Sequence, residues 1–162
     1  MIARLLAISL LAFASVAHAR PSRVDLVRVD KSDRELTLLS QGKVIATFEI
    51  ALGGNPTGHK QQEGDERTPE GRYVLDFKKP DSAYFRAIHV SYPNQADAQR
   101  AKKAGVAPGG AIMIHGQRNG FGWLASISQR YDWTDGCIAL SNEDMQRVWD
   151  LVKVPTTIEI AP

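Results

Sequence analysis

The sequence predicts a mostly β fold, and three patterns support this prediction. Apolar and polar residues alternate from Val44 to Ile50, which is the period of a strand with one buried face. Apolar and β-branched residues dominate the run 24–29, and Gln41-Gly42 separates two strand-like runs, as in a β-hairpin. Helical spacing is confined to two segments in the second half of the chain. We therefore expect a mostly β domain with two short helices.

The composition is that of an ordinary globular protein. Of the 162 residues, 43% are hydrophobic and 23% are charged, and the formal net charge is +2. These values exclude a disordered or collagen-like chain. No dense basic stripe is present, so we expect no nucleic-acid partner. The single cysteine, Cys137, cannot form an intrachain disulfide.

The first 19 residues have the organisation of a secretory signal peptide. Arg4 precedes an apolar run at 5–16, which is shorter than the about 20 residues that a membrane-spanning helix needs. A small-x-small cleavage pattern then ends the segment at Ala19. A buried N-terminal helix is the alternative, but the segment has no polar face. We expect a signal peptide at 1–19 and one exported domain at 20–162, with no membrane span in the mature chain.

Turn residues divide the exported part into strand-like runs. Apolar alternation or β-branched content predicts strands at 24–29, 34–39, 44–50, 72–78, 87–91, 111–114 and 156–160. In the fourth of these runs, we expect Tyr73, Leu75 and Phe77 to share one face. Residues 53–71 contain five glycines and two prolines without periodicity, which predicts a long loop. Loops of this length in compact domains are often functional.

Two segments have helical signals. Residues 95–104 are rich in Ala, Lys and Gln, and Gly105 follows as a C-cap. Ser141 is suited to cap a second helix. The apolar face of this helix recurs at i, i+3, i+4 and i+7, with Met145, Val148, Trp149 and Val152. We expect both helices to be short and peripheral to the strands.

Cys137 is the candidate for covalent chemistry, because an exported chain rarely retains an unpaired thiol without a reason. The alternative is a buried, inert cysteine. Cys137 and His115 each lie beside a glycine at the end of an apolar run. A thiol attacks as its thiolate, and an imidazole can accept its proton. Gly136 lets a substrate carbonyl approach the backbone, whose N–H groups can stabilise an oxyanion.

The remaining histidines allow two other interpretations. His59 lies in the glycine-rich loop and is a second candidate for the site, whereas His89 lies in a strand-like run and is expected to be structural. One cysteine and three histidines could in principle bind zinc. However, they contain no closely spaced pair of the CxxC or HxxxH kind, so we expect no metal.

These motifs resemble the L,D-transpeptidase catalytic domain, or YkuD-type, family. The resemblance depends on His115-Gly116 and on Thr134-Asp135-Gly136-Cys137-Ile138, and it extends over residues 23–161. The glycine-rich stretch 53–60 and the Thr-Pro-Glu-Gly turn at 68–71 also look like the family. Many members carry His at the position of Asp135. Together the motifs look like a Gram-negative, periplasmic subgroup.

The resemblance implies a β-sandwich with a groove and a mechanism without a cofactor. By resemblance, Cys137 attacks the diaminopimelate carbonyl of a peptidoglycan stem peptide and forms a thioester, which an amine resolves. His115 is implied as the base, with its imidazole oriented by the Gly116 carbonyl. The N–H groups of Gly136 and Cys137 are implied as the oxyanion hole. Substrate-binding residues are expected at His59, Trp133, Thr134 and Asp135.

Two further functions remain open at this point. If water resolves the thioester, the protein is a thiol hydrolase that acts on peptidoglycan peptides or on peptidoglycan–lipoprotein linkages. A wall-linked lipoprotein is then a partner besides the stem peptides. A non-catalytic wall-binding module is a third interpretation, and such a module would tolerate Cys137→Ala. The intact pair of Cys137 and His115 favours an enzyme.

Overall fold

A computed structural model describes residues 23–162, in which eight strands form one sheet. The expected signal peptide at 1–19 lies outside the described residues. The strands are β1 (Leu26–Asp30), β2 (Glu35–Ser40), β3 (Lys43–Glu49), β4 (Gly71–Lys79), β5 (Ala87–Val90), β6 (Met113–His115), β7 (Ile138–Ala139) and β8 (Thr156–Ala161). The helices are α1 (Gln95–Ala104), the 3-10 turn η1 (Gly122–Leu124), α2 (Ala125–Ser128) and α3 (Asn142–Leu151). The expected mostly β fold is confirmed.

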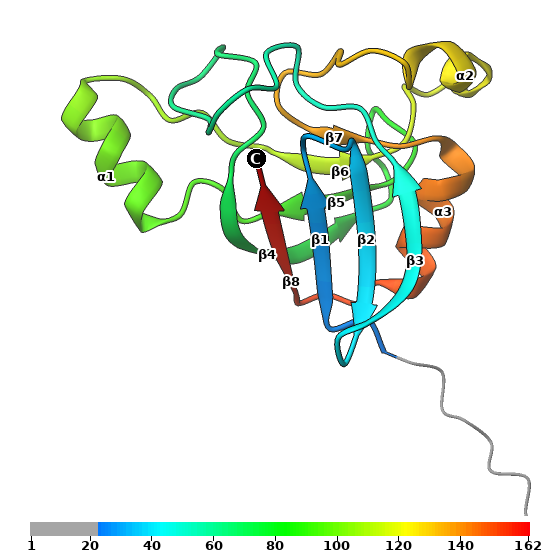
Figure 1. The fold of residues 1–162 in the computed structure, drawn as a ribbon. Helices are drawn as coiled ribbons and strands as arrows, with labels where there is room; N and C mark the ends of the chain where they lie inside the picture. Colours follow the sequence, from blue (N-terminus) through cyan, green and yellow to red (C-terminus); the bar gives the residue numbers. More distant parts are fainter. Residues whose placement is uncertain (1–22) are drawn as a thin grey trace, which may run out of the picture.

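The sheet curls over itself, so that one sheet provides both layers of the expected sandwich. Its strand order is β3-β2-β1-β8-β4-β5-β6-β7. In Figure 1, β1, β2 and β3 stand at the front while β5, β6 and β7 run across behind them. Strand β8, the last in sequence, pairs in parallel with β1 and antiparallel with β4. The C-terminal strand therefore joins the two halves of the sheet.

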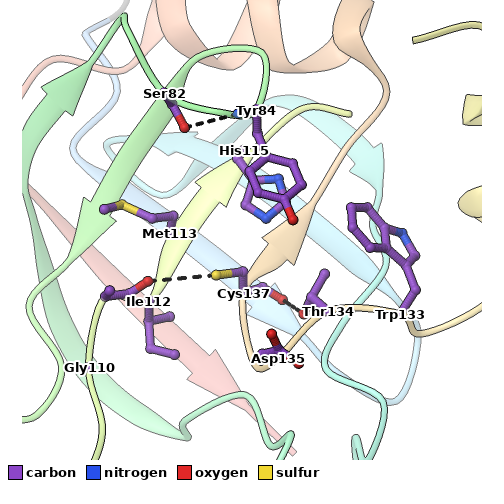
Figure 2. A pocket seen from close by; sticks show the side chains of 11 residues that line it. Ser82, Tyr84, Gly110, Ile112, Met113, His115, Trp133, Thr134, Asp135 and Cys137 are labelled. Atoms are coloured by element: carbon purple, nitrogen blue, oxygen red, sulfur yellow. Dashed lines mark hydrogen bonds between the residues drawn. The ribbon is translucent and has the colours of Figure 1, made fainter. Parts of the chain in front are cut away.

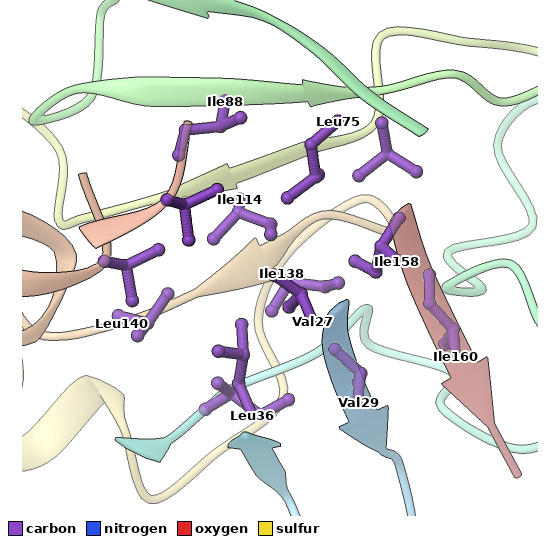
Figure 3. Close-up of a cluster of buried hydrophobic side chains, with 14 of the residues drawn as sticks. Val27, Val29, Leu36, Leu75, Ile88, Ile114, Ile138, Leu140, Ile158 and Ile160 are labelled. Carbon is purple, nitrogen blue, oxygen red and sulfur yellow. The ribbon is translucent and has the colours of Figure 1, made fainter. Parts of the chain in front are cut away.

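The hydrophobic core lies inside this curl. Figure 3 shows Val27 of β1, Ile114 of β6, Ile138 of β7 and Ile158 of β8 converging on one another. All four side chains are fully buried. Burying an aliphatic side chain of this size stabilises a fold by about 1.5–3 kcal/mol. The same core therefore anchors both β6 and β7, the two strands that carry the candidate site.

The hairpin and both expected helices are confirmed. Gln41 and Gly42 join β2 to β3 with φ values of 50° and 74°, as in the left-handed turns that match strand twist. Asn94 forms a capping box at the start of α1, which Gly105 ends with a φ of 71°. The Ser141 hydroxyl accepts from the Asp144 N–H at the start of α3. In addition, the structure contains η1 and α2, which bury no residue.

The side-chain face expected for β4 is wrong near the C-terminal end of the strand. Tyr73 and Leu75 are buried, but Phe77 is 46% exposed. The reason is a bulge, because the register between β4 and β5 shifts between Leu75 and Lys78. The displaced Phe77 ring stacks on His89, with centroids 4.5 Å apart. His89 also has its Nδ1 2.7 Å from Asp76 Oδ1, so its contacts are on the outer face of the sheet.

The long loop at 53–71 is held by two buried lysines. Lys31 donates to the carbonyl oxygens of Gly58 and Thr68 at 2.8 and 3.2 Å and to Glu70 Oε1 at 2.7 Å. Lys60 donates to Asp65 Oδ1 at 2.8 Å. Both lysine side chains are 3% exposed. These contacts give an irregular segment a defined path beneath the candidate site.

Candidate active site

Cys137 and His115 line one cavity of about 360 Å³ (Figure 2). Its other lining residues are Ser82, Tyr84, Gly110, Ala111, Ile112, Met113, Trp133, Thr134 and Asp135. The structure thus brings together five of the expected site residues, namely His115, Trp133, Thr134, Asp135 and Cys137. Among the residues that line this cavity, Asp135 is the only one of the types Asp, Glu, Lys and Arg.

Adjacent strands place the imidazole and the thiol on the same side of the sheet. His115 is the last residue of β6, and Cys137 directly precedes β7. The two strands run in parallel, with His115 opposite Ala139. Because side chains alternate along a strand, Cys137 projects to the same face as Ala139 and therefore as His115.

The His115 ring has a fixed orientation. It is 3% exposed, and its Nδ1 donates to the Gly116 carbonyl oxygen at 2.6 Å. This bond places the proton on Nδ1 and leaves Nε2 as a free acceptor. Burial lowers the pKa of His115, although the bond to Gly116 opposes this shift. Burial therefore favours the neutral form of the ring, which is the form that a general base requires.

The Cys137 thiol also favours its neutral form in this environment. Burial raises its pKa, a hydrogen bond with the Met113 backbone and the charge of Lys60 oppose this shift, and the nearby Asp135 carboxylate adds to it. The thiol lies 3.7 Å from the Ala111 carbonyl oxygen, to which it donates a weak hydrogen bond. Both shifts favour the uncharged forms of the pair, so forming the thiolate requires a proton acceptor nearby.

Hydrogen bonds brace the turn that leads into Cys137. The Thr134 hydroxyl donates to the Cys137 carbonyl oxygen at 2.8 Å and accepts from the Gly136 N–H at 3.1 Å. The Thr134 hydroxyl and the Gly136 N–H therefore have their hydrogen-bond partners within the turn. Gly136 has a φ of +115°, and a Cβ there would lie 2.5 Å from the Arg67 carbonyl oxygen. Only glycine fits where the turn packs against the 53–71 loop.

Two aromatic rings enclose the histidine. The ring of Tyr84 lies 4.3 Å from that of His115, and the ring of Trp133 lies 5.9 Å from it, measured between centroids. Figure 2 shows Tyr84 against the imidazole and Trp133 at the side of the cavity opposite Met113. Sequence reasoning missed Tyr84, because it lies in an irregular segment with neither periodicity nor a motif.

His59 is not brought to this cavity. Its Nδ1 accepts from the Glu70 N–H at 3.0 Å, and its Nε2 lies 3.1 Å from Asp97 Oδ1. Asp97 is buried and also accepts from the Tyr73 hydroxyl at 2.9 Å. His59 thus connects the 53–71 loop to α1, in a cluster separate from the residues around Cys137.

The described part of the chain shows no grouping of three or more His, Cys, Asp or Glu side chains suited to hold a metal ion. Within residues 23–162, no helix has the length and apolar character needed to cross a membrane.

The fold and the motifs define a class of protein. Residues 25–160 match the model of the L,D-transpeptidase catalytic domain, or YkuD, family. This match covers most of the chain, so the chain belongs to the L,D-transpeptidase catalytic domain family.

Particular relatives support this assignment. The chain is 31% identical over 132 residues to YafK of Escherichia coli K12, which carries L,D-transpeptidase in its name. This alignment covers 78% of the chain and 46% of YafK. The crystal structure of the helical cell shape determining protein Pgp2 from Campylobacter jejuni superposes with a TM-score of 0.65. The two sequences are 29% identical, and the alignment covers 85% of this chain and 47% of Pgp2. Bd1075 of Bdellovibrio bacteriovorus is 25% identical with a TM-score of 0.60, over 86% and 48% of the two chains. The chain thus spans about half the length of these relatives.

Proposed function

We propose that the protein is a cysteine acyltransferase that acts on peptidoglycan stem peptides, with Cys137 as nucleophile and His115 as base. The observation that carries this proposal is one cavity holding the single cysteine and a buried histidine whose Nδ1 is held by the Gly116 carbonyl oxygen. In a chain of this family, such a pair supports nucleophilic catalysis.

The proposed first step is acylation of the thiol. His115 Nε2 takes the proton from Cys137 Sγ, and the thiolate attacks the carbonyl carbon between diaminopimelate and the terminal D-Ala. A tetrahedral oxyanion forms, and the Cys137 N–H is our preferred donor to it. The Gly136 N–H can donate a second hydrogen bond to the oxyanion only if its hydrogen bond to the Thr134 hydroxyl breaks. The C–N bond then breaks, the leaving amine takes the proton from His115, and a thioester remains on Sγ.

The second step transfers the acyl group to an acceptor. An amine of another stem peptide, or a D-amino acid, attacks the thioester carbonyl. The C–S bond breaks, and a proton returns to the thiolate. Around the cavity, Trp133 and Asp135 are proposed to contact the substrate, and the Asp135 carboxylate is suited to an ammonium group of diaminopimelate. We leave His59 out of the proposed site because its contacts lie elsewhere.

A thiol hydrolase is the second candidate, and one observation favours it. No Lys or Arg lines the cavity, and the ammonium of Lys60, whose charge acts on Cys137, is paired with Asp65. Neither observation provides a side-chain cation placed to bind the carboxylate of a leaving D-Ala. A linkage whose leaving group carries no adjacent carboxylate, such as a peptidoglycan–lipoprotein amide, avoids this requirement. The same thioester would form on Cys137, and water would resolve it.

Product analysis by mass spectrometry tests both candidates. The protein is incubated with a disaccharide-tetrapeptide, with and without a D-amino acid, beside Cys137→Ala. Dimers or exchange products that the variant lacks would support transfer. Tripeptide alone, or release of lipoprotein from sacculi, would support hydrolysis. If wild type and Cys137→Ala gave the same products from every substrate, both candidates would be wrong.

We also propose that the chain is exported to the periplasm and that residues 1–19 are removed. The support is the signal-peptide pattern of the sequence and the likeness to YafK of a Gram-negative bacterium. N-terminal sequencing of protein from a periplasmic extract tests this, and a chain that still begins at Met1 would contradict it. The likeness to Pgp2 supports a role in cell shape.

A further inference from the structure

Exposed aromatic side chains are concentrated in one segment of the chain, between β6 and β7. Four of the eight large hydrophobic residues found exposed in the described chain lie between positions 121 and 131. Among them, Phe121, Trp123 and Tyr131 are 47%, 75% and 67% exposed. They lie on or next to η1 and α2, which bury no residue. Scattered apolar residues need no explanation, but such a gathering marks a binding surface. We call these three residues the aromatic surface.

Phe121 connects the aromatic surface to the cavity that holds Cys137. A second cavity of about 230 Å³ is lined by Gln117, Arg118, Phe121, Leu124, Ser128 and Trp133. Trp133 also lines the first cavity. Its indole is therefore a wall shared by the two cavities. A polymer with one part in the first cavity can continue across Trp133 to Phe121, and from there along the exposed segment 121–131.

The polar groups of this segment indicate the chemistry of the occupant. Residues 117–131 contain two arginines and no Asp or Glu, and five Ser, Asn and Gln residues stand among the aromatic residues. Trp and Tyr offer large, rigid contact areas that combine an apolar face with a polar edge. A sugar ring has the matching combination of a C–H face and hydroxyl or amide substituents. A lipid surface instead favours a long amphipathic helix, whereas α2 has four residues.

We propose that Phe121, Trp123 and Tyr131 form a docking surface for the glycan strand to which the stem peptides are attached. This inference rests on the proposed function, because only a glycan-borne peptide brings a sugar chain to the edge of the cavity. The ligand is a polymer of N-acetylated amino sugars. Stacking on the rings holds the strand while one stem peptide reaches Cys137.

Binding of peptide-free glycan strands tests the surface without any catalysis. The full chain is compared with the double variant Trp123→Ala/Tyr131→Ala, and Phe77→Ala is the control because Phe77 is an exposed aromatic residue on β4. Loss of interfacial Trp and Tyr side chains is expected to weaken glycan binding by roughly tenfold or more. The control should bind as the wild type does. Equal binding by the wild type and the double variant would overturn the proposal.

Turnover separates this proposal from the proposed function. The double variant should lose activity on intact sacculi but keep activity on a tetrapeptide without sugar. Glycan binding that depends on the aromatic surface, in a protein that turns over neither substrate, would support the surface and contradict the enzyme. Turnover of the sugar-free peptide by a protein that does not bind glycan would support the enzyme and contradict the docking surface. Binding to phosphatidylglycerol vesicles instead of glycan, lost in the double variant, would overturn the glycan proposal in favour of a membrane.

Discussion

Gly136 has a φ of +115°, and a Cβ at this position would lie 2.5 Å from the Arg67 carbonyl oxygen. Gly136→Ala should therefore destabilise the fold by more than the about 1–2 kcal/mol that left-handed backbone strain alone costs. It should also displace Cys137 and reduce turnover. Urea unfolding and product formation measure the two effects.

Gly64→Ala is the matched control for this variant. Gly64 also has a positive φ, of +76°, but a Cβ there would meet nothing within 4 Å. Gly64→Ala should therefore lose the stability that backbone strain costs, without a steric clash, and it should leave turnover unchanged. If both variants lost the same stability and the same activity, contact with Arg67 would not be the reason that residue 136 is glycine.

The charge of Asp135 should contribute to the pH at which Cys137 reacts. Burial and the Asp135 carboxylate both raise the pKa of the thiol. Thiolate is therefore scarce at neutral pH and increases as the pH rises. Asp135→Asn removes one of the two causes, so the pKa of Cys137 should fall and alkylation at neutral pH should become faster. The rate of iodoacetamide alkylation as a function of pH measures this.

Asp150→Asn, on α3 and outside the cavity, is the control for the charge change and should leave the alkylation profile in place. An alkylation midpoint that moves to higher pH in Asp135→Asn would contradict the electrostatic argument.

Single residues of the cavity were predictable to different degrees. His115 and Cys137 could be found from the sequence because each stands in a motif beside a glycine. Tyr84 could not, because its place against the imidazole depends on how the irregular segment before β5 folds back. His59 shares a loop with motif residues, yet its partners lie on α1, and no local pattern indicates that contact.

Among the larger elements, the 53–71 loop depends on charged groups for its shape. Asp65 accepts from Lys60 Nζ at 2.8 Å and from the backbone N–H groups of Gln61, Gln62 and Arg67. Burial alone would raise the pKa of Asp65, but these hydrogen bonds outweigh it and lower the pKa to about 2. In the unfolded chain the pKa is about 3.9.

A carboxyl group with a lowered pKa stabilises the fold above its unfolded pKa, and this contribution is lost as the pH falls towards the folded value. Asp65→Asn should therefore be less stable than wild type at pH 7, and the difference should shrink between about pH 4 and pH 2. Urea unfolding at several pH values measures it. Glu63→Gln, an exposed change in the same loop, should show no such dependence. A difference that grows on acidification would refute this account.

Local signals determined how well each element could be predicted. The bounds of α1 follow from its cap residues, and those of β2 and β3 from the Gln41-Gly42 turn. Phe77 was misplaced because a bulge changes the side-chain alternation without changing the sequence pattern. α2 is a single turn of four residues, which is too short for a helical period to be visible.

At the scale of the whole molecule, the curled sheet depends on pairings that no local pattern specifies. β1 and β8 lie at opposite ends of the described chain and pair in parallel along their lengths. The sequence shows that both are strands, but their partnership depends on the core that they share. The resemblance to a known family, and not the periodicity, therefore supported the expected sandwich.

Because one core joins both halves of the sheet, the domain should unfold as one unit. Ile138 and Leu36 are both fully buried in this core, on β7 and β2 respectively. Replacing either with Ala should reduce the free energy of unfolding by about 2–5 kcal/mol. Tryptophan fluorescence and circular dichroism should give coincident transitions in both variants.

The two variants should nevertheless differ in activity at temperatures where both remain folded. Ile138 follows Cys137 directly, so the cavity left by Ile138→Ala lets β7 shift and moves the thiol relative to His115. Since a small misplacement of reacting groups can reduce a rate about a hundredfold, turnover should fall sharply in Ile138→Ala. Leu36→Ala, with comparable destabilisation, should keep most of its turnover because β2 carries none of the residues that line the cavity. Equal loss of turnover in both variants would mean that the site responds to global stability and not to the local packing beneath Cys137.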